Sequence, residues 1–122
     1  MGMEIATRLS DQLARYIDLA SDEAKLTAAN VANIDTPGYR AVGMNFEAEM
    51  RRAVTDVDDN RPEQAVRVTD VDGLVARPDG NDVSMDREGL NMAQAQLEYK
   101  TGVSLLRIEY QRVMDAIHAD SK

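Results

Sequence analysis

The sequence predicts a mainly α-helical fold, in which two long helices at the N- and C-terminal ends pack together as a hairpin or coiled coil. An irregular segment with a short β-hairpin joins them. Two observations predict this fold: apolar or small residues recur every three or four positions at both ends of the chain, and no proline interrupts either stretch. We expect a single domain (1–122), made of an N-terminal helix (1–36), a loop and short β segment (37–82) and a C-terminal helix (83–122).

The first helix has one continuous apolar face. Its members are Ile5, Leu9, Leu13, Tyr16, Ala20, Ala24, Thr27, Val31 and Ile34. We expect the helix to end near Asn33, because Thr36 precedes a proline and is driven out of the α region. Pro37 and Gly38 then suit the centre of a type II turn, in which the glycine takes the positive φ.

The middle segment is less regular. Residues 45–50 are compatible with a short helix, and the alternation over 66–69 is typical of a short strand. The Asp-Gly pair at 72–73 is a hairpin signal, so residues 74–76 are the expected return strand.

The second long helix is expected over residues 85–118. Ser84 suits its N-cap, and acidic residues follow in the first turn. Gly89 and Gly102 lie inside it, although each costs roughly 1 kcal/mol relative to alanine. Either the helix tolerates them, or another backbone packs closely there.

This second helix carries two apolar stripes on roughly opposite sides, at about 100° per residue. One stripe consists of Leu90, Ala93, Leu97, Thr101, Leu105 and Ile108; the other consists of Tyr99, Val103, Leu106, Tyr110, Val113 and Ile117. The N-terminal helix can cover one stripe. The stripe that begins with Tyr99 then packs on the middle segment, as in an ordinary small core, or is covered by neighbouring subunits.

The second interpretation predicts a subunit interface that involves both helices. Its candidate residues are Leu9, Leu13, Leu19, Leu26, Tyr99, Val103, Leu106, Tyr110, Val113 and Ile117. Leu19 and Leu26 lie off the main face of the first helix, so they either reach a neighbour or widen the core stripe.

The chain is acidic, with 22 acidic residues against 14 basic ones and a net charge of −8. Nucleic acids and anionic membranes both require a basic surface, so we expect neither partner. No apolar run is long enough to cross a membrane, and we expect no direct membrane insertion. The first residues lack the apolar stretch of a secretory signal, so export would have to follow another route.

Residues for catalysis are scarce. The chain has no cysteine, and its one histidine is His118. No Cys/His or Ser/His/Asp arrangement can therefore be assembled, and we expect no enzyme activity, no cofactor, and no catalytic or metal-binding residue. The Asp-Gly-Asn-Asp run at 79–82 has the composition of an ordinary turn before a helix.

One acidic run partly matches a calcium-binding loop. Asp56, Asp58 and Asn60 stand at the first, third and fifth positions of such a loop. The sixth position needs glycine and is Arg61, and the twelfth needs glutamate and is Arg67. We therefore expect a solvated acidic loop instead.

Residues 26–40 resemble the N-terminal signature of flagellar rod and hook proteins, a helix end that reads roughly ANNIANxxTPGYK. The matching residues are Asn30, Asn33, Thr36, Pro37, Gly38 and Tyr39. Residues 80–88 are similar to the GNxVDxDRE segment of the short, proximal-rod branch of this family, and residues 96–99 to its NxLxYQ continuation. Residues 41–43 depart from the Ala-Arg-Asp that is more usual there.

The resemblance implies a structural subunit of the proximal rod of the bacterial flagellar basal body, which polymerises through its terminal helices and transmits torque for swimming. It implies export by the flagellar type III apparatus without a cleaved signal peptide, and a place in the periplasmic rod. The implied partners are the rod proteins FlgC, FlgF and FlgG, the FliE adaptor and the MS ring. An acidic helical adaptor or flagellar export chaperone remains the alternative, because its stripes would look similar.

Overall fold

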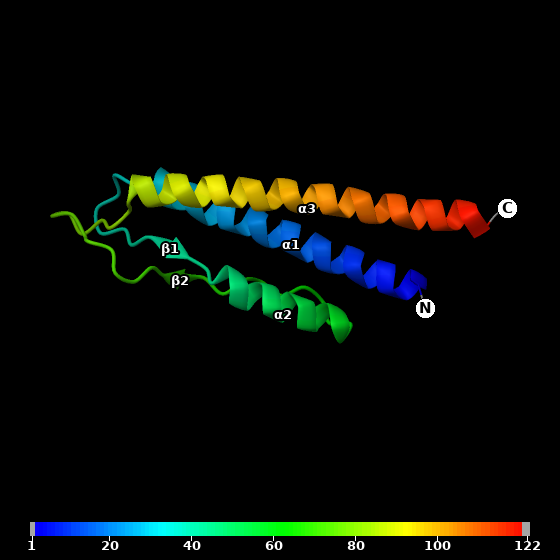
Figure 1. Cartoon of the computed structure of the whole chain (residues 1–122). Coiled ribbons are helices and arrows are strands. Elements are labelled where there is room, and N and C mark those ends of the chain that lie inside the picture. The colour runs from blue at the N-terminus through cyan, green and yellow to red at the C-terminus, as the bar shows by residue number, and fades with distance from the viewer. Residues whose placement is uncertain (1, 121–122) are drawn as a thin grey trace.

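The computed structural model describes the backbone of residues 2–120 and the side chains of residues 7–119. Its elements are α1 (Gly2–Ala32), β1 (Val42–Gly43), α2 (Phe46–Asp58), β2 (Thr69–Asp70) and α3 (Met85–Asp120). In Figure 1, α1 and α3 lie side by side with the two chain ends at the same end of the pair, and α2 lies along the other side of α1. This confirms the mainly α fold with two long packed terminal helices.

The seam between α1 and α3 is built from small and polar residues. On α1 the deeply buried residues are Ala20, Thr27 and Asn30. On α3 the buried residues stand seven apart, at Glu88, Ala95, Gly102 and Glu109. A seven-residue repeat keeps one side of a helix against its partner, as in a coiled coil. The predicted hairpin is therefore present, but its most deeply buried positions are small or polar, and the larger side chains beside them are half-buried.

Gly102 is a point of close contact between the two helices. A Cβ atom at this position would lie 2.7 Å from Cγ1 of Ile17 and 2.9 Å from Cδ2 of Tyr16. A Cβ atom at Gly89 would meet nothing within 4 Å. Close packing therefore explains Gly102, although the neighbours are the side chains of Ile17 and Tyr16 and not another backbone as expected, and simple tolerance explains Gly89.

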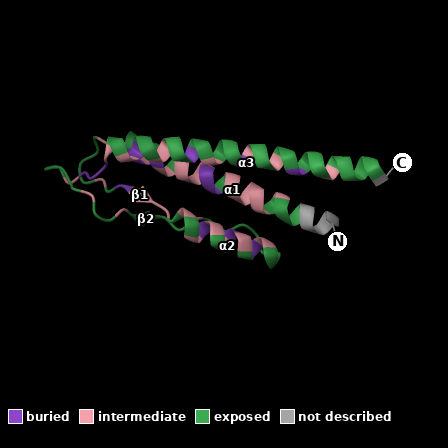
Figure 2. Cartoon of the chain, in the orientation of Figure 1, coloured by how far each residue is buried: buried purple, intermediate pink, exposed green. Residues whose placement is uncertain are grey.

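The assignment of the two apolar stripes of α3 was wrong. The stripe that includes Leu90 and Leu97, which we expected to face α1, lies on the solvent side, where these leucines are 69% and 67% exposed. The other stripe lies nearer α1, with Val103, Leu106 and Val113 half-buried. The physical reason is that small and polar residues at every seventh position occupy the seam. Figure 2 shows exposed residues along most of α3.

The middle segment contains more helix and a different strand pairing than predicted. The short helix expected at 45–50 is α2, which continues to Asp58. β2 pairs antiparallel with β1, with Val42 opposite Asp70, and residues 74–76 form no strand. The Asp-Gly pair at 72–73 does form a turn. The strand that pairs with β2, however, is β1, which precedes α2 in the sequence, and not a strand that follows this turn.

α2 is fixed at its start and along one face. The side chain of Asn45 caps it by accepting a hydrogen bond from the Ala48 amide at 3.0 Å. The Phe46 ring meets Tyr16 of α1 edge-to-face, with centroids 5.7 Å apart. Leu19 of α1 and Ala53 of α2 are both buried and line one small space between the two helices. α2 thereby covers the side of α1 that α3 leaves free.

Replacing Gly102 with alanine should destabilise the chain, although alanine favours helix by about 1 kcal/mol. The new methyl group must displace Ile17 and Tyr16, and overpacking of this kind costs about 1–3 kcal/mol. The matched control, Gly89→Ala, enters open space and should stabilise the helix by up to about 1 kcal/mol. Urea denaturation of both variants measures the difference, and equal stabilisation by the two alanines would rule out the tight contact.

Candidate functional site

The residues of the family-like motif meet a second segment in a cluster of buried polar groups, which we call the polar junction. It consists of Asn30, Asn33, Tyr39, Asn81, Asp82 and Glu88, with the backbone of the turn and of β1 between them. The end of α1, the 36–39 turn, β1, the 80–84 segment and the first turn of α3 all converge there. Residues that are 58 positions apart in the sequence are therefore in direct contact.

Asn30 is the centre of the polar junction and is only 1% exposed. Its Nδ2 donates to the Val42 carbonyl at 2.8 Å and to Oε1 of Glu88 at 3.0 Å. Its Oδ1 accepts from the Val42 amide at 2.9 Å and from the Tyr39 hydroxyl at 3.1 Å. One side-chain amide thus joins α1, β1, the turn and α3, and both of its ends are used.

Two further asparagines, Asn33 and Asn81, hydrogen-bond the backbone and side chains around the turn. Asn33 donates from Nδ2 to the Ala29 carbonyl at 2.8 Å, and its Oδ1 accepts from the Thr36 hydroxyl at 3.1 Å. The fully buried Asn81 donates to the carbonyls of Asn33 and Thr36 at 2.8 and 2.9 Å. Asn33 thus satisfies a carbonyl near the end of α1 without a left-handed conformation, since Asn60 alone among the described non-glycine residues has a positive φ.

The turn itself has the predicted type II geometry. The Tyr39 amide donates to the Thr36 carbonyl at 3.2 Å, and Gly38 has a φ of 75°. The Gly38 amide donates to the Asp79 carbonyl at 2.8 Å, and a Cβ atom on Gly80 would lie 3.3 Å from Cα of Gly38. Glycine at position 80 allows the two loop backbones to approach closely, whereas Gly38 is required by its positive φ, since a Cβ atom there would meet nothing within 4 Å.

Asp82 accepts hydrogen bonds from the two residues directly before β1. It is 2% exposed, and its Oδ1 accepts from the Ala41 amide at 2.6 Å while Oδ2 accepts from Nε of Arg40 at 3.1 Å. The sequence prediction treated residues 79–82 as an ordinary turn and missed the roles of Asn81 and Asp82. Their similarity to the GNxVDxDRE segment was the signal that could have identified them.

Glu88 brings a buried charge to the first turn of α3. It is 0% exposed and pairs with Arg87, whose Nη1 lies 2.6 Å from Oε1. Burial, followed by the nearby Glu88 carboxylate, raises the pKa of the Tyr39 hydroxyl, which therefore remains a donor to Asn30. Ser84 caps the same helix by accepting from the Arg87 amide at 3.3 Å, as predicted.

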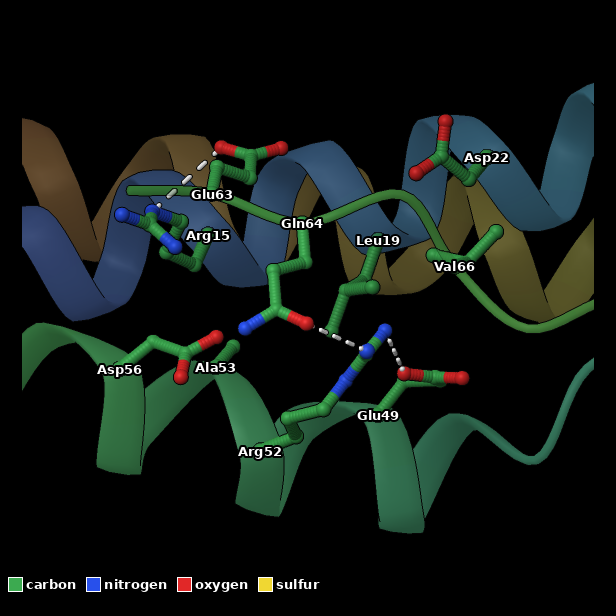
Figure 3. A pocket seen from close by; sticks show the side chains of 10 residues that line it. All are labelled: Arg15, Leu19, Asp22, Glu49, Arg52, Ala53, Asp56, Glu63, Gln64 and Val66. Carbon is green, nitrogen blue, oxygen red and sulfur yellow. Dashed lines mark hydrogen bonds and ion pairs between the residues drawn. The ribbon is translucent and has the colours of Figure 1, made fainter. Parts of the chain in front are cut away.

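A second charged cluster ties α2 to the extended stretch after it (Figure 3). Oε1 of Glu49 accepts from the Arg67 amide at 2.8 Å and from its Nε at 3.1 Å, and Oε2 accepts from Nη2 of Arg52 at 2.7 Å. Burial opposes ionisation of Glu49, but these hydrogen bonds outweigh it and hold its pKa below the usual value. Its contribution to stability is therefore present at neutral pH and is lost as the pH falls through that lowered pKa.

The acidic run at 56–60 differs from the solvated loop that was expected. Asp56 and Asp58 belong to α2 and not to a loop, and Asp56 is buried, whereas Asp58 is exposed. Among the side chains of residues 7–119, no three His, Asp or Glu groups are placed to hold a metal ion. His118 lies exposed near the end of α3. Within the described part of the chain, no helix combines the length and apolar content needed to span a membrane.

The predicted interface residues fall into three groups. Leu19 is buried between α1 and α2 within one chain, so it is not available to a neighbour and widens the core instead. The half-buried members are Leu13, Leu26, Val103, Leu106 and Val113, and the exposed members are Leu9, Tyr99, Tyr110 and Ile117. Leu90, Leu97, Leu105 and Ile108, which the interface prediction omitted, form the larger exposed apolar surface.

Asn30→Asp should cost about 2 kcal/mol or more at neutral pH. A carboxylate cannot donate to the Val42 carbonyl, and it places a second negative charge beside Glu88. The control is Asn45→Asp, because Asn45 uses only its oxygen as a cap and aspartate keeps that role within about 0.5 kcal/mol. Thermal unfolding of both variants measures the difference. Equal stability of the two variants would show that the Asn30 amide is dispensable.

Comparison with known proteins shows which sequences the chain resembles. The family model described as "Flagella basal body rod protein" matches residues 21–40, the last part of α1 and the turn. The flagellar basal body rod protein FlgB of Salmonella typhimurium is 32% identical over 119 residues, covering 83% of this chain and 86% of the relative. FlgB of Yersinia ruckeri is 28% identical, covering 83% and 87%. FlgB of Escherichia coli K12 is 26% identical, covering 84% and 88%. The chain therefore belongs to the FlgB family of flagellar basal body rod proteins.

Proposed function

We propose that this chain polymerises within the proximal rod of the flagellar basal body through the outer faces of α1 and α3. The observation that carries the proposal is the solvent-facing stripe of α3. Leu90, Leu97, Leu105 and Ile108 are all exposed large apolar residues of α3, and Leu90 and Leu97 follow seam residues by two positions and so lie on the side away from α1. Exposed apolar surfaces of this kind mark protein interfaces. Membership of a rod protein family supports a structural and non-enzymatic role.

A groove between α1 and α3 offers a complementary surface. It has a volume of about 530 Å³ and is lined by Ala20, Ser21, Ala24, Ala95, Gln96, Tyr99 and Lys100. Small residues at its floor leave room for large side chains of a neighbour. When the exposed stripe of α3 on one subunit packs into this groove on the next, the contact is head-to-tail. Such a contact repeats into a helical assembly unless the rotation between subunits closes a ring.

The energies suit a polymer made of many modest contacts. Full burial of one leucine is worth about 1.5–3 kcal/mol, and association costs at least about 4 kcal/mol in lost translational and rotational freedom. A few leucines on one stripe therefore give only a weak pairwise contact. Contacts repeated to several neighbours add up to a stiff tube that can transmit torque.

We propose as partners the rod proteins FlgC, FlgF and FlgG, the FliE adaptor and the MS ring. We also propose that the flagellar type III apparatus exports the chain without a cleaved signal peptide, and that the chain resides in the periplasmic rod. The competing function is an acidic adaptor or export chaperone. The chain would then be absent from purified basal bodies, whereas a rod subunit would be a stoichiometric part of them.

Leu97→Glu should abolish swimming while leaving the folded monomer intact. The side chain is 67% exposed, so the effect on stability should stay within about 0.5 kcal/mol, whereas a charge in a subunit contact prevents burial. Leu106→Asp and Val113→Asp should also block assembly, but both residues are half-buried beside α1 and such variants would also weaken the hairpin. Soft-agar swimming and electron microscopy of basal bodies provide the readout.

Leu97→Met is the matched control, because it keeps an apolar side chain of similar volume and should swim normally. Normal swimming and complete rods with Leu97→Glu would contradict the role given to the outer stripe. Complete rods in a strain that lacks the gene would contradict the proposed function itself.

A further inference from the structure

Two carboxyl groups face each other across the seam between α1 and α3. They belong to Glu23 of α1 and Glu98 of α3, which lie close enough for a hydrogen bond between their side chains. In each of them Oε2 is buried and has no hydrogen-bond partner among the described residues. Two carboxylates without a donor between them would leave buried oxygens unsatisfied and like charges in contact.

We propose that Glu23 and Glu98 share one proton, and that this shared proton links α1 to α3. A protonated carboxyl group donates a short, strong hydrogen bond to an ionised one. The shared proton therefore supplies the missing donor and removes one of the two charges. This device belongs to the single chain and does not depend on rod assembly.

The surroundings of the pair favour the shared proton. Burial is the first cause, followed by the hydrogen bond and the charge of Glu98, and together they raise the pKa of Glu23 to about 7. Tyr16 of α1 also faces the pair, and the pKa of its hydroxyl is raised by burial and then by Glu98 and Glu23. Tyr16 in turn contacts the uncharged ring of Phe46 at the start of α2.

The arginine that shares a cavity with Glu23 is already paired with another carboxylate. Arg87 lines a cavity of about 150 Å³ together with Glu23, but its Nη1 is bound to Glu88 at 2.6 Å. From β1 and the residue after it, Val42, Gly43 and Met44 line the same cavity and carry no charge. The cavity gives water access to Glu23, so the proton can exchange with solvent.

The pH dependence follows from the direction of the shift. The pKa of Glu23 is raised in the folded chain from an ordinary value of 4.5 to about 7. The folded chain therefore holds a proton that the unfolded chain has lost over this range, and stability falls as the pH rises. The contribution is fully present below about pH 4.5, declines from there to about pH 7 and is absent above it.

Glu98→Gln tests the proposal, because the glutamine amide donates to Glu23 without needing a proton. Carboxyl carbon NMR of the wild-type chain should show Glu23 titrating near pH 7, and in the variant its midpoint should fall by about one unit or more. The melting temperature of the wild type should fall relative to that of Glu98→Gln between pH 5 and pH 8. Glu47→Gln, at an exposed carboxylate, should follow the wild type at every pH.

Other titrating groups cancel in the comparison. Burial and then Asp18 raise the pKa of Glu63, for example, but Glu63 is unchanged in the wild type, the variant and the control. Titration of Glu23 below pH 5 in the wild-type chain would overturn the proposal. A constant difference in melting temperature across the range would overturn it as well. If Glu98→Gln does not fold, the wild-type NMR titration alone decides.

Discussion

The structure depends on one buried side-chain amide at the end of the helical hairpin. Asn30 donates to the Val42 carbonyl and to Glu88, and it accepts from the Val42 amide and the Tyr39 hydroxyl. If the buried amide loses one of these hydrogen bonds, a buried polar group is left unpaired, which costs free energy. The four hydrogen bonds are therefore kept together, or the end of the hairpin opens. The turn, the short strand and the first turn of α3 are therefore positioned by the same group.

This junction also determines which face of α3 meets solvent. Because Asn30 holds Glu88 against α1, the residues seven positions apart that follow, Ala95 and Gly102, continue the seam. A residue two positions further along a helix lies about 200° around it, on the opposite side. Leu90 and Leu97 follow Glu88 and Ala95 by two positions, and they are the exposed leucines of the outer stripe. Buried polar contacts at one end thus set the rotation of an apolar surface over the whole helix.

The sequence predicted the helices well because their periodic patterns are local. The same patterns misassigned the seam, since Glu88, Gly102 and Glu109 are not residues that an apolar count selects. Glu88 is held in the seam by its neighbour Arg87 and by Asn30, which is 58 positions away in the sequence, and local periodicity gives no information about that second partner. The prediction of the strand pairing was wrong for a related reason. β2 pairs with β1, and all of α2 separates the two strands in the sequence, so a local turn signal carries no information about that partner.

Native-state hydrogen exchange tests the central role of the polar junction most directly. The amides of Ala41, Val42 and Val83 donate to the side chains of Asp82, Asn30 and Asn81, outside any helix. If the junction holds the hairpin together, these amides will exchange only with the global opening of α1 and α3, as slowly as the amides of the seam. Exchange of these three amides as fast as that of the exposed stretch 63–65 would contradict the account.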